Sequence, residues 1–167
     1  MKNIALIGMP ASYKTAVGKK LAAKIGRMSV DTDRLVEFEA ARSVEEIFSL
    51  YGEEIFRDLE TKALARAVEA ENAVISTGGG IVERAENLEL LKNCCVIYLY
   101  ASPAELVKRL SGARPLLAGD PEKKLRELYV RREPLYFAAA DKKFSTNGKT
   151  SDAVAQEISR FLSRLPL

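Results

Sequence analysis

Short apolar segments alternate with segments of helical apolar spacing along the whole chain. Each apolar segment predicts a β-strand, and each is followed by at least one predicted helix. Such alternation connects parallel strands through helices that cover both faces of the sheet. It predicts an α/β fold of three layers, α/β/α, with a five-stranded parallel sheet. The strands are expected at Asn3–Ile7, Met28–Val30, Ala73–Ile75, Cys94–Tyr100 and Lys143–Thr146.

The helical segments carry their own boundary signals. Ser43 and Glu46 form a capping box that begins a helix, and Gly52 breaks it. Pro134 lies inside a helical pattern and predicts a kink or break near Glu133. With no long linker, we expect one domain over residues 1–167. The other helices are expected at Lys14–Ile25, Thr32–Ala40, Glu53–Glu69, Ala85–Leu91, Pro121–Ala139 and Ser151–Leu162, with one more beginning at Ser102-Pro103.

The composition excludes several classes of protein. The chain has no histidine, which excludes Ser–His triads, histidine zinc sites and histidine general bases. Its 26 Lys and Arg against 23 Asp and Glu give a net charge of +3, too small to favour nucleic acid. The apolar runs are shorter than the roughly 18 residues of a membrane span. Because the adjacent Cys94 and Cys95 cannot pair with each other, we expect a cytoplasmic protein. We also expect it to act as a monomer and not to bind membranes.

The loop after the first strand has the position and length of a phosphate-binding P-loop, G-x-x-x-x-G-K-[ST]. It reads Gly8-Met9-Pro10-Ala11-Ser12-Tyr13-Lys14-Thr15. In such a loop, backbone N–H groups bind phosphates, Lys14 would reach the β- and γ-phosphates, and the Thr15 hydroxyl would bind Mg²⁺. Tyr13 replaces the second glycine, and a left-handed backbone there costs about 1–2 kcal/mol. The simpler alternative is an ordinary strand–turn–helix with a surface lysine.

Two further loops follow predicted strands. Asp31 and Asp33 flank Thr32 at the carboxyl end of a strand, where open α/β sheets bind their ligands. Their carboxylates could hold Mg²⁺ and accept a proton from a substrate hydroxyl, or either could simply cap a helix. Gly78-Gly79-Gly80 suits a place where backbone amides approach a ligand, or else a tight turn. Both loops are therefore candidate parts of a binding site.

Three arginines are candidates for binding an anionic ligand. Arg57 lies in an apolar-flanked helix and could instead form a solvated ion pair with Glu60, three residues on. Arg132 lies beside the expected helix break. Arg114 lies in a loop between two helices, where a lid could bring its charge to a transferring phosphoryl group or leave it exposed to solvent. Two arginine forks would suit a small carboxylate, which they pair in bidentate fashion.

Taken together, these segments resemble the shikimate kinase family, whose P-loop fold is of the nucleoside-monophosphate-kinase type. The resemblance covers nearly the whole chain, in the family's order and approximate spacing. Its most specific parts are the Asp-Thr-Asp, triple-glycine and Arg-x-Pro-Leu-Tyr segments, because adenylate and gluconate kinases share the P-loop and lid without this set. The matching segments are Lys14-Thr15, Asp31-Thr32-Asp33, Gly52-Glu53-x-x-Phe56-Arg57-x-x-Glu60, Ser76–Gly80, Arg114-Pro115-Leu116-Leu117 and Arg132-x-Pro134-Leu135-Tyr136.

The resemblance implies an enzyme that phosphorylates the 3-hydroxyl of shikimate with ATP and Mg²⁺, in the pathway to aromatic amino acids. It implies a substrate-binding helical segment at about residues 32–60 and a mobile lid at about residues 110–122. The implied catalytic residues are Lys14, Asp33 and Arg114, and the implied metal ligands are Thr15 and Asp31. The implied shikimate contacts are Asp33, Arg57, Gly78, Gly79, Gly80 and Arg132. The implied nucleotide contacts are Pro10, Ala11, Ser12, Tyr13, Lys14, Thr15, Ala16, Arg109, Arg114 and Lys149.

The loop departs from the family pattern, which normally reads Gly-x-x-Gly-Ser-Gly-Lys-[ST]. Ala11 and Tyr13 replace two glycines, and Ala16 follows where Ser or Thr is common. These departures predict weaker nucleotide binding with the shikimate half intact. Two alternatives stay open: a related small-molecule kinase of the gluconate type, and a shikimate-binding protein with impaired ATP binding.

Overall fold

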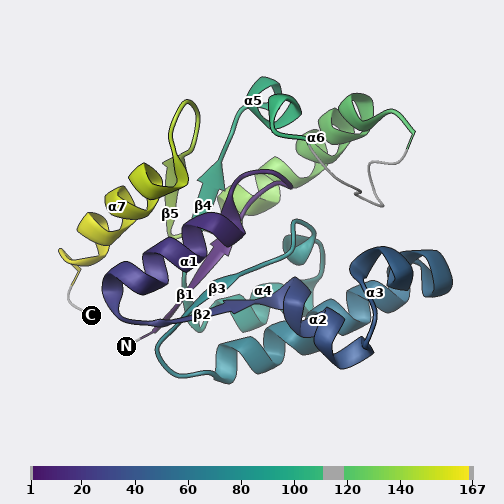
Figure 1. Cartoon of the computed structure of the whole chain (residues 1–167), viewed down its shortest axis with the longest axis horizontal. Coiled ribbons are helices and arrows are strands. Elements are labelled where there is room, and N and C mark those ends of the chain that lie inside the picture. Colours follow the sequence, from purple (N-terminus) through teal and green to yellow (C-terminus); the bar gives the residue numbers. More distant parts are fainter. Residues whose placement is uncertain (1, 111–118, 166–167) are drawn as a thin grey trace.

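A computed structural model describes residues 2–110 and 119–165 of the chain. Its centre is one parallel sheet in the order β2-β3-β1-β4-β5 (Figure 1), which confirms the predicted five-stranded parallel sheet. All five residues of β1 are buried, as expected for a central strand covered on both faces. The last strand begins and ends one residue earlier than predicted. The strands are β1 Asn3–Ile7, β2 Met28–Asp31, β3 Ala73–Ser76, β4 Cys94–Tyr100 and β5 Lys142–Ser145.

Helices cover both faces of the sheet and complete three layers (Figure 1). On one face, α1 and α7 bury Leu21 and Ile158 against Leu6 and Ile97 of the sheet. On the other face, helices α3 to α6 form a larger core that includes Tyr136. The helices are α1 Lys14–Ile25, α2 Thr32–Ala40, α3 Val44–Glu69, α4 Ala85–Leu91, α5 Pro103–Lys108, α6 Pro121–Ala139 and α7 Ser151–Leu162, with a 3₁₀ turn η1 at Ile81–Glu83.

Local signals set most of the helix boundaries. The capping box of Ser43 and Glu46 is present at the start of α3, and Gly52 interrupts that helix with φ 80° and ψ 177°, as predicted. The predicted break near Glu133 is wrong, because α6 continues through Pro134 to Ala139. Pro134 is exposed, so the carbonyl that loses its N–H partner one turn earlier, at the exposed Val130, can bond to water instead. In the part of the chain described, no helix is long and apolar enough to cross a membrane.

The parallel sheet brings three loops to one edge. The loop between β1 and α1 follows the central strand, Asp31 ends β2, and Ser76 ends β3. Because parallel strands present their carboxyl ends at the same edge, these loops lie together. A hydrogen bond from Gly78 N to Thr32 Oγ1, at 3.2 Å, joins two of them directly. The fold therefore assembles the segments that the sequence marks as candidate site loops.

Candidate active site

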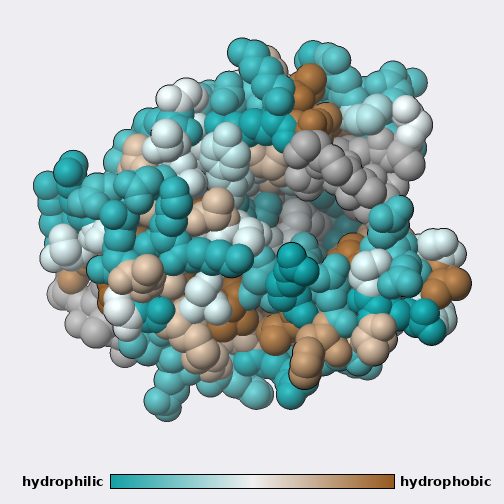
Figure 2. All heavy atoms as spheres, viewed as in Figure 1, coloured by the Kyte–Doolittle hydropathy of each residue, from teal (hydrophilic) through white to brown (hydrophobic). Residues whose placement is uncertain are grey.

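A cleft of about 630 Å³ lies at this edge of the sheet. Figure 2 shows the molecule hollowed between the part that carries α6 and the part that carries α2 and α3, with hydrophilic residues around the hollow. Its volume is in the range of small-molecule sites. Most of the predicted site residues line the cleft: Pro10, Ala11, Tyr13, Lys14, Thr15, Ala16, Asp31, Asp33, Arg57, Gly78, Gly79, Gly80, Arg109 and Arg132.

Three predicted site residues are not among the residues that line this cleft. The Ser12 side chain is fully buried in the loop. Lys149 forms an ion pair with Glu157 at 2.9 Å. Arg114 lies outside the described residues, as does most of the segment predicted as a lid. Their roles in nucleotide binding stay predictions.

The loop from Gly8 to Thr15 keeps a P-loop shape although two of its glycines are replaced. Ala11 has φ 66° and Tyr13 has φ 71°, both left-handed. The Lys14 ammonium donates to the carbonyls of Gly8 and Met9 at 2.8 Å each, which holds it inside the loop. Left-handed backbone costs a non-glycine residue about 1–2 kcal/mol. Ala11 and Tyr13 therefore store strain in the loop.

The Tyr13 ring is held by Arg109. The guanidinium carbon of Arg109 lies 3.9 Å from the centroid of the ring, which is a close cation–π contact. Arg109 also donates to Glu105 at 2.9 Å and to the Thr146 carbonyl at 2.7 Å. Arg109 thus connects the P-loop to α5 and to the loop after β5. Sequence reasoning predicted Arg109 as a nucleotide contact and missed its contact with Tyr13 and its partner Thr146.

Thr15 and Asp31 form a pair suited to Mg²⁺. The Thr15 hydroxyl donates to Asp31 Oδ2 at 2.8 Å. Asp31 Oδ1 accepts from the backbone N–H of Asp33 at 3.1 Å, so Asp31 also caps α2. A hydroxyl and a carboxylate beside a phosphate-binding loop are the oxygen ligands that Mg²⁺ takes in P-loop proteins. The residues present therefore fit this metal, and the helix-cap alternative holds for Asp31 at the same time.

Asp33 is the buried acid of the cleft. Its Oδ1 is buried and, among the residues described, has no hydrogen-bond partner. Burial, together with the charges of Asp31 and Glu60, raises the pKa of Asp33 to about 6, although Lys14 acts in the opposite direction. An unpartnered carboxylate with a pKa in this range is suited to accept a proton from a bound hydroxyl.

Arg57 and Arg132 reach the cleft from opposite sides, on α3 and α6. Arg57 is 6% exposed and pairs with Glu60 at 2.8 Å and Glu53 at 3.2 Å. The predicted alternative, an ion pair with Glu60, is therefore present, but it is buried and not solvated. Arg132 is 1% exposed, donates to Glu83 Oε2 at 2.7 Å, and keeps a buried Nε without a partner in the described ranges. Two desolvated guanidiniums at one cleft provide a strong site for a carboxylate.

The three glycines make room for these side chains. A Cβ at Gly80 would collide with the Arg57 guanidinium, and one at Gly78 would collide with the Glu60 carboxylate. A Cβ at Gly79 would lie 2.9 Å from Pro10 Cδ, in the P-loop. None of the three has a positive φ, so space and not backbone conformation requires glycine here. The predicted alternative of a tight turn does not by itself explain the run.

Sequence reasoning missed two acids of the site. Glu60 was considered as the partner of Arg57 and as part of the family pattern but not as a site residue, yet it is fully buried, and burial raises the pKa of its carboxyl. Glu83 lies three residues after the glycine run, at the end of η1. Burial acts to raise the pKa of Glu83, but Arg132, Arg131 and Arg57 outweigh it and the pKa is lowered. An acid three residues after Gly80 is the one signal in the sequence that could have drawn attention to it.

The parallel sheet, the P-loop after its central strand and the cleft beside it define a P-loop kinase fold. A family model for shikimate kinase matches residues 10–163. A shikimate kinase of Symbiobacterium thermophilum is 47% identical over 162 residues, 93% of each chain. That of Caldanaerobacter subterraneus subsp. tengcongensis is 45% identical, over 99% of this chain and 98% of the relative.

Among solved structures, a shikimate kinase from Acinetobacter baumannii in complex with shikimate is similar to this chain with a TM-score of 0.96 and 35% identity. The similarity covers 100% of this chain and 96% of that one. The chain belongs to the shikimate kinase family.

Proposed function

We propose that this protein transfers the γ-phosphoryl group of ATP to the 3-hydroxyl of shikimate, in the pathway to aromatic amino acids. The observation that carries the proposal is the pair of buried arginines, Arg57 and Arg132, at the same cleft as the P-loop and Asp33. The arginines suit the carboxylate of a small substrate, and the P-loop suits the phosphates of a nucleotide. One cleft thus brings an acceptor and a donor together.

Each part of the cleft has a role in this reaction. The loop N–H groups and Lys14 bind the phosphates of ATP, and Thr15 with Asp31 holds Mg²⁺, which would neutralise charge on them. Asp33 accepts the proton of the attacking hydroxyl. Phosphoryl transfer depends on positioning and charge stabilisation and needs no histidine side chain. The absence of histidine from this chain is therefore compatible with the reaction.

Two segments have roles that follow from the proposal. Residues 32–60 are assigned to substrate binding, whereas the predicted lid at residues 110–122 with Arg114 lies mostly outside the described residues and stays a prediction. Arg109 and Lys149 contribute to nucleotide binding. Shikimate and ATP are the partners, and we propose that the protein acts as a monomer in the cytoplasm.

The two alternatives are less well supported. A gluconate-type kinase does not explain a second buried arginine at the cleft, and the family match runs over residues 10–163. A shikimate-binding protein without ATP would need a damaged P-loop. Here Ala11 and Tyr13 keep the left-handed backbone and Lys14 stays inside the loop, which supports nucleotide binding.

An ADP-release assay with shikimate, with gluconate and without either acceptor tests the proposal. We expect ADP release that requires both shikimate and Mg²⁺. ADP release with gluconate in place of shikimate would favour the related kinase. Calorimetric binding of shikimate without any ADP release would favour the binding protein.

A further inference from the structure

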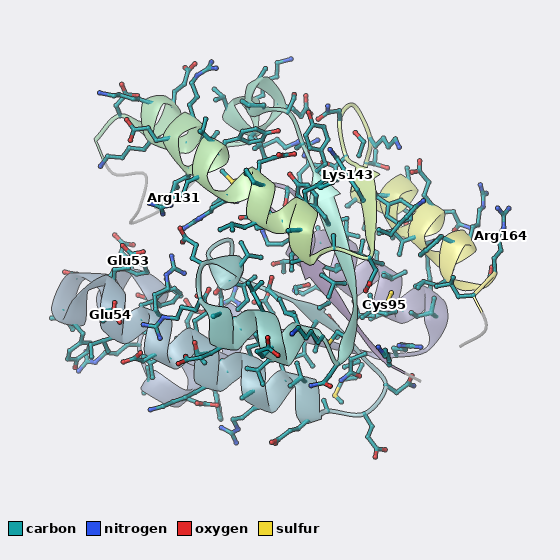
Figure 3. All side chains as sticks on the ribbon, turned by 180° about the vertical axis from the view of Figure 1, so that it is seen from behind. Glu53, Glu54, Cys95, Arg131, Lys143 and Arg164 are labelled. Atoms are coloured by element: carbon teal, nitrogen blue, oxygen red, sulfur yellow. The ribbon has the colours of Figure 1, made fainter. Side chains whose placement is uncertain are left out.

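Glu83 binds three arginines at once. Its Oε2 lies 2.7 Å from Arg132 Nη2 and 3.6 Å from Arg57 Nη2, and its Oε1 lies 2.6 Å from Arg131 Nη2. The arginines come from α3 and α6, whereas Glu83 lies on η1 between them in space. Figure 3 shows Arg131 projecting from α6 toward the part of α3 that carries Glu53 and Glu54. One carboxylate therefore connects the two sides of the cleft.

This carboxylate contacts the arginines from outside the cleft. Arg57 and Arg132 belong to the lining of the cleft, and Glu83 does not. Its side chain is 18% exposed, and the side chains of the two arginines are 7% and 1% exposed. Two buried guanidiniums that face one small ligand repel each other unless a negative charge lies near both. Glu83 Oε2 adds to the negative charge that Glu60 places near both, accepts a hydrogen bond from Arg132 Nη2 at 2.7 Å, and lies 3.6 Å from Arg57 Nη2.

We infer that Glu83 is a positioning residue for the carboxylate of the substrate. It orients Arg132 through a hydrogen bond and holds its negative charge close to Arg57, and Arg131 orients Glu83 in turn. The inference rests on the proposed function, because it takes a carboxylate substrate as the ligand of the two arginines. Glu83 touches neither the substrate nor the reacting atoms in this arrangement.

The charge of Glu83 also has an opposite effect on substrate binding, and the experiment distinguishes the two effects. A negative charge close to the clamp also repels an incoming carboxylate. If repulsion dominated, removing the charge of Glu83 would tighten shikimate binding. We expect orientation to dominate, because Arg132 is almost fully buried and its buried Nε already lacks a partner among the described residues. Losing Glu83 would leave a second unpaired group on the same guanidinium.

The experiment compares Glu83→Gln and Glu83→Ala with a matched control, Glu54→Gln. Glu54 pairs with Arg84 at 2.7 Å on the same side of the molecule but lies outside the cleft lining. Shikimate binding is measured by calorimetry without nucleotide, and KM and kcat by ADP release. We expect about tenfold or greater loss of shikimate affinity for Glu83→Ala and about threefold for Glu83→Gln, which keeps one acceptor for Arg132. KM for ATP and kcat at saturating shikimate should stay within about twofold.

Each outcome decides between the two effects. Unchanged or tighter shikimate binding in both Glu83 variants overturns the inference and leaves the proposed function standing. Equal losses for shikimate and ATP indicate a general packing defect and also overturn it. If the parent protein itself does not bind shikimate, the proposed function fails and the inference fails with it.

A second variant keeps the test decisive if Glu83→Ala does not fold. Arg131→Met removes the partner of Glu83 Oε1 from a side chain that is 58% exposed, so folding should be preserved. We expect about twofold to threefold weaker shikimate binding and unchanged KM for ATP, since Glu83 loses one of its three partners. No change in shikimate affinity would contradict the role given to Arg131.

Discussion

The cleft has two halves that use glycine for different reasons. The phosphate half is the loop from Gly8 to Thr15, and the arginine half is the glycine run at residues 78–80 with Arg57 and Arg132. In the phosphate half, the backbone must turn left-handed, yet Ala11 and Tyr13 stand at two left-handed positions. In the arginine half, no left-handed turn is needed, yet Gly78-Gly79-Gly80 are all glycine because Glu60, Pro10 and Arg57 fill the space beside them. The phosphate half therefore stores backbone strain, whereas a side chain added in the arginine half would have to displace Arg57 or Glu60 or press on Pro10.

The halves also differ in how they are held together. The phosphate half is one continuous segment, fixed by backbone geometry and by Lys14 bonded to its own loop. The arginine half is assembled from α3, η1 and α6 through buried ion pairs centred on Arg57 and Glu83. Changes to the arginines themselves should accordingly act on shikimate binding, and their effects should be larger than those of changes in the phosphate half.

The largest effect is expected for Arg132→Ala. Removing a buried guanidinium that faces the substrate should weaken shikimate binding by about 2–5 kcal/mol, since a desolvated charge loses its partner. ATP binding should change little. Arg126→Ala is the matched control, because Arg126 is an exposed arginine of the same helix that pairs with Glu122 at 2.7 Å. Equal losses for both ligands would show that the variant is misfolded and that Arg132 has no specific role.

Asp33→Asn should lower kcat by about 10²-fold or more while ATP affinity is kept. The amide keeps the size of the side chain and loses the base. Single-turnover kinetics with saturating shikimate and ATP measures this directly. A kcat close to that of the parent would show that Asp33 is not the base and only packs in the cleft.

The same substitution has a pH-dependent effect on stability. The pKa of Asp33 is raised from 3.8 to about 6, so the folded state disfavours the ionised carboxylate. This cost is absent at pH values below 3.8 and develops as the pH rises through about 6. Asp33→Asn should thus gain stability relative to the parent between pH 4 and pH 7. Urea unfolding in metal-free buffer at several pH values checks it, and a constant difference between the two proteins would argue against a raised pKa.

Two alanine substitutions in the glycine run should weaken the binding of different ligands. Gly80→Ala would displace Arg57 and weaken shikimate binding by about 1–3 kcal/mol, a usual cost of overpacking. Gly79→Ala would press on Pro10 and should instead weaken ATP binding by a similar amount. Calorimetry with each ligand compares the two variants. Both variants losing the same ligand would mean that the run acts as one unit.

The sequence was sufficient for the strands and helices in their order along the chain and for the position of the P-loop, because these depend on contiguous patterns, whereas the order of the strands within the sheet was not predicted. The bounds of α6 were predicted, but not its passage through Pro134 without a break, since the exposure of Pro134 and Val130 is a property of the folded chain. Glu83 was not identified, because its partners are on α3 and α6, 26 and 49 residues away along the chain from Arg57 and Arg132 respectively. Ion pairs across elements leave no periodic signal, whereas strands, helices and loops do.

Of the substitutions discussed, replacement of Tyr13 should have the smallest effect on ligand binding. Tyr13 is left-handed, and we expect the same loop shape in the free and the nucleotide-bound protein, so that its strain is common to both states. Strain common to both states lowers stability and leaves affinity unchanged. Tyr13→Gly should therefore bind ATP within about threefold of the parent, instead of the weaker binding by the parent that the missing glycine suggests.

The stability of two Tyr13 variants isolates that strain. Tyr13→Gly relieves the backbone but loses the contact with Arg109, whereas Tyr13→Ala loses the contact and keeps the strain. Tyr13→Gly should thus be more stable than Tyr13→Ala by about 1 kcal/mol, after allowing for the greater freedom of glycine in the unfolded chain. Urea unfolding measures the difference, and calorimetry with a non-hydrolysable ATP analogue measures the affinities. ATP binding tightened fivefold or more in the glycine variant, about 1 kcal/mol, would mean that the free loop leaves its left-handed shape and that the phosphate half is less preformed than the arginine half.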